Sequence, residues 1–204
     1  MRFLPAGREA LLVECADAAE VIGLHRAVAA DRPDGVTEVV PAARSLLVMF
    51  DHEVTGAERV TTHLRRLRPA PATHSGSAVV DIAVAYDGVD LAEVAELTGL
   101  TEPEVVRRHV AGDYVVAFCG FAPGFAYLVG ADPALTVPRR ETPRTRVPAG
   151  SVALAGEFTG VYPRESPGGW QLVGRTGSSL WDLDRDPPAL LSPGTRVRFV
   201  RVDP

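Results

Sequence analysis

The hydrophobic pattern of residues 1–68 predicts a compact unit of strands and two helices. Apolar runs at Ala10–Cys15, Val36–Val40 and Ser45–Phe50 have the length and the β-branched content of strands. Apolar residues recur at helical spacing after Asp17, and again from Thr55 to about residue 68. The predicted order, strand–helix–strand–strand–helix, resembles the first five elements of a ferredoxin-like split βαβ domain.

Capping-box spacings indicate where the helices begin. An aspartate or hydroxyl residue followed three positions later by glutamate satisfies two free N–H groups of a first helical turn. The pattern occurs four times: Asp17 with Glu20, Thr55 with Glu58, Asp90 with Glu93, and Thr101 with Glu104. We therefore expect a helix to begin at each of these points.

A second unit follows a segment of linker composition at residues 69–77. It opens with a predicted strand, Ala78–Tyr86, and two short helices, Asp90–Leu97 and Thr101–Ala111. From Tyr114 onward only strands and turns are expected. The predicted strands are Tyr114–Phe118, Ser151–Ala155, Gly160–Tyr162, Trp170–Val173 and Arg196–Val202. This pattern predicts an α+β N-terminal domain with its linker at 1–77, and a mostly-β domain at 78–204 that forms a small barrel or closed sheet.

Glycine and proline are concentrated in the second domain. Residues 112–204 hold 12 of the 19 glycines and 11 of the 17 prolines. Proline fixes φ and glycine opens φ values closed to other residues, so long helices are excluded there. The same region is rich in Phe, Tyr, Val and Leu, which argues against disorder. Rigid loops on a β framework are the expected result.

Composition and charge exclude several classes of function. The formal net charge of −5 argues against general affinity for nucleic acid. No apolar run approaches the ~20 residues of a membrane span, and the first residues lack a signal-peptide layout. A cytoplasmic protein is expected.

Cys15 and Cys119 stand far apart within apolar surroundings, which favours buried thiols over a disulfide.

The chain contains no lysine, because all 21 Lys+Arg residues are arginine. A Walker A lysine, a Schiff-base lysine, a Ser-x-x-Lys nucleophile system and a biotin-accepting lysine are thereby excluded. Asparagine is absent too, which excludes a Cys-His-Asn triad. Any ATP or biotin chemistry would need groups from another polypeptide.

Arginines gather between Pro138 and Thr176, a window of net charge +3 in which six arginines face three glutamates. The planar guanidinium fork suits bidentate recognition of a carboxylate or phosphate. The alternative is that half of these arginines are solvated turn residues paired with glutamates. Arg139 and Arg144, which each follow a proline, are the preferred pair for an anionic ligand.

Two further motifs in this window predict a pocket. In Ser166-Pro-Gly-Gly-Trp, the N–H groups of Gly168 and Gly169 are expected to cradle an oxyanion, while Trp170 either walls a pocket or fills the core. The candidate substrate- or anion-binding residues are Arg139, Arg144, Tyr162, Gly168, Gly169, Trp170, Arg175 and Thr176. The run 120–125 is either a second pocket wall or an exposed patch for a partner protein, through Phe121, Pro123 and Phe125.

His109 is the single candidate for general acid–base chemistry. It lies near the end of a predicted helix, where a histidine acts as a general base or as a C-terminal cap. The other histidines show no metal-ligand spacing, and no Cys-x-x-Cys or His-Glu-x-x-His motif occurs. No metal site is predicted.

Four motifs give the chain a family resemblance: GFAPGFAYL, PRR…PR..VPAGSVA, G.YP..SPGGW and GRT…LLSPG.RV.F. They resemble the allophanate hydrolase subunit 1 family, which includes the 5-oxoprolinase subunit PxpB and the sporulation kinase inhibitor KipI. The resemblance extends upstream to about Ala78, and more loosely to Ala10–Glu14. It covers most of the chain.

The resemblance implies a cyclophilin-like β-barrel after the α/β domain. It also implies a homologous subunit 2 of the PxpC or KipA type as partner, and a third, PxpA-like subunit. Such a complex opens 5-oxoproline to glutamate with ATP, and no cofactor is expected on this chain alone. The alternatives are allophanate hydrolase or urea carboxylase-type amide chemistry, or inhibition of a histidine kinase through the loop Phe121–Phe125.

The residues and the resemblance together give one site hypothesis. 5-oxoproline carries one carboxylate and one lactam, so arginines suit the first and backbone N–H groups suit the second. Arg139, Arg144 and Arg175 are expected to face a cleft shared with subunit 2. On this hypothesis, Arg144→Ala abolishes activity and leaves folding intact.

Overall fold

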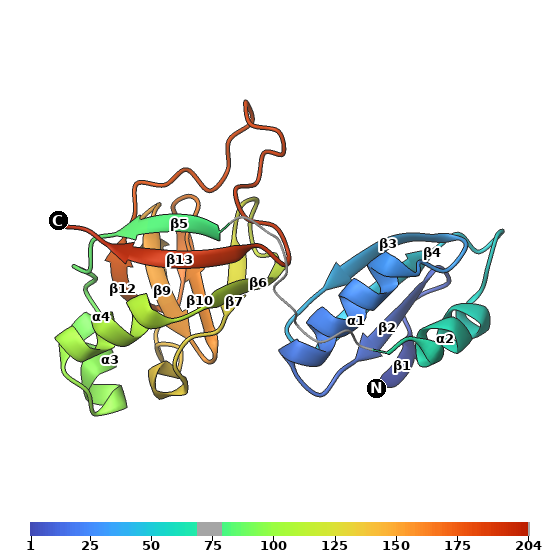
Figure 1. Cartoon of the computed structure of the whole chain (residues 1–204), viewed down its shortest axis with the longest axis horizontal. Coiled ribbons are helices and arrows are strands. Elements are labelled where there is room, and N and C mark those ends of the chain that lie inside the picture. The colour runs from blue at the N-terminus through green and yellow to red at the C-terminus, as the bar shows by residue number, and fades with distance from the viewer. Residues whose placement is uncertain (69–78, 204) are drawn as a thin grey trace. The chain divides into compact units, whose positions relative to one another are not determined.

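The computed structural model describes residues 1–68 and 79–203. The chain divides into two compact units, Met1–Ser75 and Gly76–Pro204 (Figure 1). The predicted linker at 69–77, and the domain boundary that follows it, lie outside the described residues.

The N-terminal unit is a four-stranded antiparallel sheet with two helices. Its strand order is β1-β2-β4-β3, so β4 separates the two strands that α1 connects. The elements are β1 (Arg2–Pro5), β2 (Ala10–Glu14), α1 (Ala18–Ala30), β3 (Val36–Pro41), β4 (Ser45–Phe50) and α2 (Ala57–Arg66). Five of these six elements follow the predicted order. The pattern missed the four-residue strand β1, and the ferredoxin-like assignment stays a prediction.

Helix starts in this unit follow the capping prediction once and depart from it once. Asp17 accepts a hydrogen bond from the Glu20 amide at 2.8 Å, and the Glu20 side chain accepts one from Ala16 at 2.6 Å. Helix α2 instead begins after Gly56, which has no side chain to cap it. The cap predicted at Thr55 is therefore wrong.

The C-terminal unit places two helices between its first strands and continues in short strands. The elements are β5 (Val79–Val84), α3 (Leu91–Thr98), α4 (Glu102–Ala111), β6 (Tyr114–Cys119), β7 (Ala126–Val129), a 3-10 turn η1 (Pro133–Leu135), β8 (Arg144–Val147), β9 (Ser151–Ala155), β10 (Phe158–Val161), β11 (Ser166–Gly168), β12 (Gln171–Arg175) and β13 (Arg196–Arg201). The pattern predicted the longer strands and missed β7, β8 and β11, which have three or four residues each.

Seven of these strands form one barrel-like sheet, in the order β12-β9-β10-β7-β6-β13-β5. Its two ends meet just beyond β5, where Ala85 and Arg175 exchange backbone hydrogen bonds of 2.9 and 2.8 Å. The sheet is thus nearly closed, which leaves few strand edges unpaired. The predicted barrel or closed sheet is observed as a nearly closed, barrel-like sheet, and the cyclophilin-like name for it stays a prediction.

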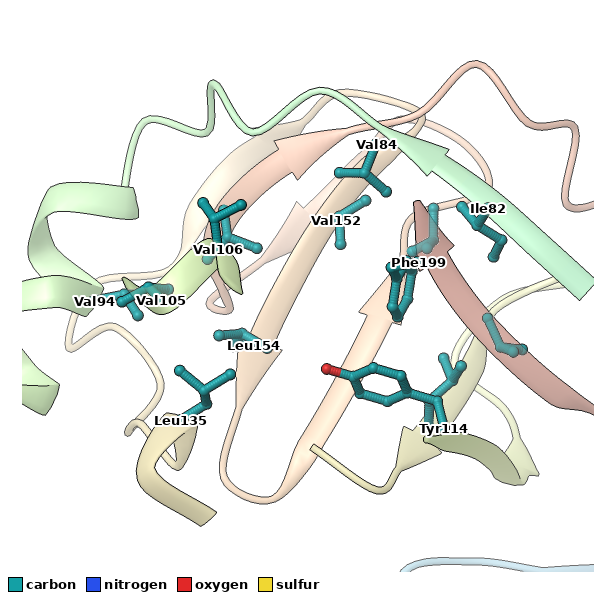
Figure 2. Close-up of a cluster of buried hydrophobic side chains, with 14 of the residues drawn as sticks. Ile82, Val84, Val94, Val105, Val106, Tyr114, Leu135, Val152, Leu154 and Phe199 are labelled. Atoms are coloured by element: carbon teal, nitrogen blue, oxygen red, sulfur yellow. The ribbon is translucent and has the colours of Figure 1, made fainter. Parts of the chain in front are cut away.

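The barrel interior is filled by large apolar side chains. Tyr114 from β6 and Phe199 from β13 point into the same space as Val152 and Leu154 (Figure 2). The rings of Tyr114 and Phe199 meet edge to face at 4.9 Å. Helices α3 and α4 add Val94, Val105 and Val106 to the same cluster. A second, aromatic cluster lies outside this core and forms the site described next.

Candidate functional site

The loop between β6 and β7 presents an exposed phenylalanine. Phe121 has a φ of 68°, a left-handed value that is uncommon for residues other than glycine, and the residue is 57% exposed. The turn is held by backbone hydrogen bonds, including Phe125 to Ala122 at 2.9 Å. A non-glycine residue held in this region needs support from its surroundings and is often found at functional sites.

Phe121 stands over a small pocket, which we call the aromatic pocket. Its ring meets those of Phe125 and Tyr162 edge to face, with centroids 5.3 and 6.2 Å apart. Phe125 also packs edge to face on Trp170 at 5.5 Å. The hollow has a volume of about 100 Å³ and is lined by Phe121, Phe125, Tyr127, Arg139, Tyr162, Pro167, Gly168, Gly169 and Trp170. Seven of these residues are among the candidates named from the sequence.

Arg139 is the cation of this pocket. Among the described residues, the ion pairs of its segment are made by Arg140, Arg144 and Arg146, which leaves Arg139 without a carboxylate within 4.0 Å. Burial raises the pKa of Tyr162, and the positive charge of Arg139 opposes that rise. The guanidinium charge therefore acts on the pocket wall and is available to an anion.

The two glycines of the pocket are in different surroundings. A Cβ on Gly168 would lie only 2.3 Å from the Tyr162 hydroxyl oxygen, whereas a Cβ on Gly169 would lie 3.6 Å from Pro143. Gly168 thus lets the phenol of Tyr162 pack directly against the backbone. The oxyanion cradle proposed for this pair of glycines stays a prediction.

Arg144 is not part of this pocket. It forms a two-fold ion pair with Asp90, with Nη2–Oδ1 at 2.6 Å and Nη1–Oδ2 at 2.9 Å. The Asp90 side chain is 3% exposed, so removal of a partner leaves a buried carboxylate short of a counter-charge. The preferred pair Arg139 and Arg144 therefore does not line one pocket, and Arg144→Ala is expected to affect folding.

Arg144 and Arg175 line a second hollow of about 300 Å³, together with Arg146 and apolar residues such as Pro148 and Leu172. Each of these arginines has an acidic partner. Arg144 pairs with Asp90, as described above, Arg175 pairs with Asp87 at 2.7 Å, and Arg146 pairs with Glu165 at 2.7 Å. The carboxylates offset the positive charge of the hollow. The alternative of solvated turn arginines paired with glutamates fits these residues only in their pairing, because all three lie in strands and only Arg146 has a glutamate as its partner.

Thr176 and Pro123 stand outside the aromatic pocket. The Thr176 amide donates to the Gly150 carbonyl at 2.8 Å, and its hydroxyl lies 3.1 Å from that of Ser178. Thr176 thereby fixes a turn. Pro123 is exposed in the same loop as Phe121.

His109 lies inside the barrel, which corrects its expected role. It is fully buried on α4, with Nδ1 2.7 Å from the Tyr86 hydroxyl and its ring 4.6 Å from the ring of Phe199. Burial lowers its pKa to about 3, so the imidazole is neutral near pH 7. It lines neither hollow, and only its backbone carbonyl takes part in ending the helix. We assign His109 to the core.

Two residues of importance were missed from the sequence. Tyr127 lines the aromatic pocket, but nothing distinguishes it from the other apolar residues of its strand. Asp90 matched a helix cap, yet its side chain makes no cap hydrogen bond. The sequence shows only that Asp90 directly precedes a helix. Its arginine partners lie 50 and 54 residues further along the chain, and no local pattern connects them to it.

Within residues 1–68 and 79–203, no group of three or more His, Cys, Asp or Glu is arranged to hold a metal ion. In the same residues, no helix is both long and apolar enough to cross a membrane.

Relatives of known name share most of this chain. The B subunit of 5-oxoprolinase from Escherichia coli O157:H7 is 44% identical over 174 residues, which cover 83% of this chain and 79% of that protein. The protein of the same name from Bacillus subtilis strain 168 is 39% identical over 202 residues, which cover 90% and 84%. The resemblance inferred from the motifs is confirmed by these relatives.

Solved structures also resemble this chain over most of its length. TTHA0988 is 37% identical with a TM-score of 0.79 over 97% of this chain, which spans only 41% of that longer chain. The urea carboxylase of Kluyveromyces lactis, at 20% identity and a TM-score of 0.72, shares the fold over 98% of this chain and 21% of its own. The model of the carboxyltransferase domain, subdomain C and D, matches residues 1–191. This chain therefore belongs to the carboxyltransferase domain, subdomain C and D, family.

Proposed function

We propose that this chain is a B subunit of 5-oxoprolinase, in a complex that opens 5-oxoproline to glutamate with ATP. The observation that carries the proposal is the 39–44% identity to two proteins of that name over 83–90% of the chain. The chain contributes a binding site, and its partner subunits contribute the groups that it lacks.

The aromatic pocket suits a small ring that bears one carboxylate. The volume of about 100 Å³ admits only a small molecule, and the walls are aromatic rings against which a flat lactam packs. Arg139 supplies a guanidinium fork that holds no carboxylate among the described residues. Within this proposal, Arg139 binds the carboxylate of 5-oxoproline and the aromatic walls exclude water from the ring.

The proposal extends to partners and to fold. Because the chain has no lysine, the cations that hold ATP come from its arginines or from the other subunits. The other subunits are a homologous PxpC-like subunit and a PxpA-like subunit, and the whole complex lies in the cytoplasm. The N-terminal unit is ferredoxin-like, with β1 in the place of the usual last strand beside β2, and the barrel is cyclophilin-like.

The test is co-expression with the two other subunits and measurement of ATP-dependent glutamate release from 5-oxoproline. We expect release by the complex, and a KM for 5-oxoproline that rises about tenfold or more in Arg139→Gln, as befits the loss of a charged hydrogen bond. Arg107→Gln removes an exposed arginine of α4 and should leave KM unchanged. A complex without activity toward 5-oxoproline, or an unchanged KM in Arg139→Gln, contradicts the proposal. Urea and allophanate in the same assay test the alternative amide substrates.

A second candidate is inhibition of a histidine kinase, and the exposed ring of Phe121 is the observation that favours it. An exposed aromatic side chain on a supported loop is a typical anchor for a protein partner. Phe121→Ser should then abolish inhibition of kinase autophosphorylation. Inhibition that is absent in the unaltered protein excludes this candidate.

A further inference from the structure

One buried carboxylate joins three segments that are far apart in the sequence. Asp90 directly precedes α3, and its side chain is 3% exposed. It accepts hydrogen bonds from Arg140 at 2.9 Å, from both Nη atoms of Arg144 at 2.9 and 2.6 Å, and from the amide of Leu172 at 2.7 Å. Its two oxygens therefore hold two guanidinium groups and one backbone N–H.

Each partner of Asp90 lies within two residues of an aromatic-pocket residue in the chain or pairs with one across a strand ladder. Arg140 follows Arg139 in the chain, and its amide donates to the carbonyl of Gly169 at 2.8 Å. Arg144 pairs with Gly168 across the β8–β11 ladder. Leu172 comes two residues after Trp170 at the start of β12. Asp90 thus anchors the chain on both sides of the pocket without lining it.

The segment that carries Arg139 depends on this anchor. Residues 138–143, all of which the structure describes, contain neither helix nor strand. Their position is set by the Arg140 amide and by the ion pairs of Arg140 and Arg144. Charge-assisted hydrogen bonds to a carboxylate that is shielded from water are short and strong. These bonds hold residues 138–143 in place, where no hydrogen-bond ladder of a β-sheet is present to do so.

Glu93 supplies a second link between the same two sides. One of its carboxylate oxygens accepts from Arg140 at 2.9 Å, and the other accepts from the Gln171 side-chain amide at 3.2 Å. Gln171 stands between Trp170 and Leu172. Glu93 is exposed, so its contribution is screened by solvent and is smaller than that of Asp90.

We propose that Asp90 is a positioning residue for the aromatic pocket: it fixes Arg139 on one side and Gly169–Trp170 on the other, so that a carboxylate-bearing ligand meets a preorganised guanidinium. The proposal rests on the proposed function of the pocket. It assigns Asp90 no contact with the ligand, because Asp90 acts only through the segments that it holds.

The kinetic test uses Asp90→Asn in the assembled complex. Displacement of Arg139 weakens binding of the carboxylate, so KM for 5-oxoproline should rise roughly tenfold or more while kcat changes less than about threefold. Because both changes remove the same interaction, Asp90→Asn combined with Arg139→Gln should be little worse than Arg139→Gln alone. Additive losses, or an unchanged KM in Asp90→Asn, would overturn the proposal.

The matched control is Asp81→Asn. Asp81 also holds an arginine through two hydrogen bonds, to Arg198 at 2.9 and 2.6 Å, but both side chains are exposed. Loss of this pair should leave KM and kcat unchanged. If Asp90→Asn does not fold, Arg140→Gln takes its place, since it keeps the Asp90–Arg144 pair and should raise KM in the same way.

A second measurement is independent of the reaction. Backbone hydrogen exchange of the chain should become faster at the Arg140 and Leu172 amides in Asp90→Asn and not in Asp81→Asn. If the unaltered complex does not act on 5-oxoproline, the proposed function fails while this measurement still decides on the anchor. Unchanged exchange at both amides refutes the anchor itself.

Discussion

At the scale of single residues, Gly168 and Gly169 show how identical neighbours acquire different roles. The sequence favours both as points of close backbone approach. In the folded chain the space beside Gly168 is filled by the Tyr162 hydroxyl, and the space beside Gly169 is open to ordinary contact. Only the position of Tyr162, set by the strand before it, distinguishes the two.

Gly168→Ala should therefore lower the free energy of unfolding by about 1–3 kcal/mol, because the new methyl group displaces the Tyr162 ring. Gly169→Ala should change it by less than about 1 kcal/mol. Thermal unfolding of the two variants compares them directly. Equal stabilities would show that Tyr162 moves aside without cost.

His109 makes a second residue-scale prediction. Its pKa is about 3 in the folded chain and 6.5 in its ordinary state, so between these values the unfolded chain binds the extra proton. Stability is then lost as the pH falls from about 6.5 toward 3, by up to about 1.4 kcal/mol per pH unit. His109→Gln should make the stability of the C-terminal unit depend less on pH. Both tryptophans lie in this unit, so its unfolding is followed by tryptophan fluorescence. His63→Gln, in the N-terminal unit, should leave this pH dependence as it is.

At the scale of elements, one local pattern has two outcomes. The capping-box spacing correctly predicts side-chain caps at Asp17 and Thr101. It fails at Thr55, because the N-cap of α2 is the next residue, Gly56, and at Asp90, whose carboxylate binds arginines instead. A local pattern describes the N–H groups nearby. It carries no information on charges that approach from 50 residues along the chain.

Asp17→Ala should lower the stability of the N-terminal unit by about 1 kcal/mol through loss of its cap. Thr55→Ala has the same sequence signature but no capping bond to lose, and it should cost less than about 0.5 kcal/mol. Urea unfolding followed by circular dichroism checks both. A similar loss in the two variants would restore Thr55 as a cap.

The strands that were missed belong to this scale too. β8 and β11 have four and three residues and pair only with each other. Such short pieces have almost no periodicity to detect, and proline lies in and around them. Their pairing follows from the surrounding barrel and from the ion pairs that Arg144 and Arg146 form.

At the scale of the C-terminal unit as a whole, closure of the sheet depends on glycine. Gly174 precedes Arg175 in β12, and a Cβ there would lie 2.5 Å from the Ala85 carbonyl oxygen. That oxygen accepts the hydrogen bond from Arg175 that joins the two ends of the sheet. A side chain at this point separates the ends.

Gly174→Ala should therefore cost about 2 kcal/mol or more of the unfolding free energy of this unit. Gly177→Ala is its control, because no atom of the described residues, apart from its chain neighbours, lies within 4 Å of the Cβ that it would add. Denaturant unfolding followed by tryptophan fluorescence measures both. If Gly174→Ala is as stable as the unaltered chain, the sheet tolerates separation of its two ends at Ala85 and Arg175.

The sequence alone determined the helices and longer strands, the change from an α/β to a β-rich unit, the absence of lysine chemistry and the family. These follow from periodicity, composition and motifs, which act over a few residues or are read directly from the chain. Tertiary structure decided which arginine has a carboxylate partner among residues 1–68 and 79–203. Arg139 and Arg144 look alike in the sequence, and only the fold brings buried Asp90 to one of them and leaves the other facing an aromatic pocket. Charge pairing depends on distance in space, and the sequence does not show which acid reaches which base.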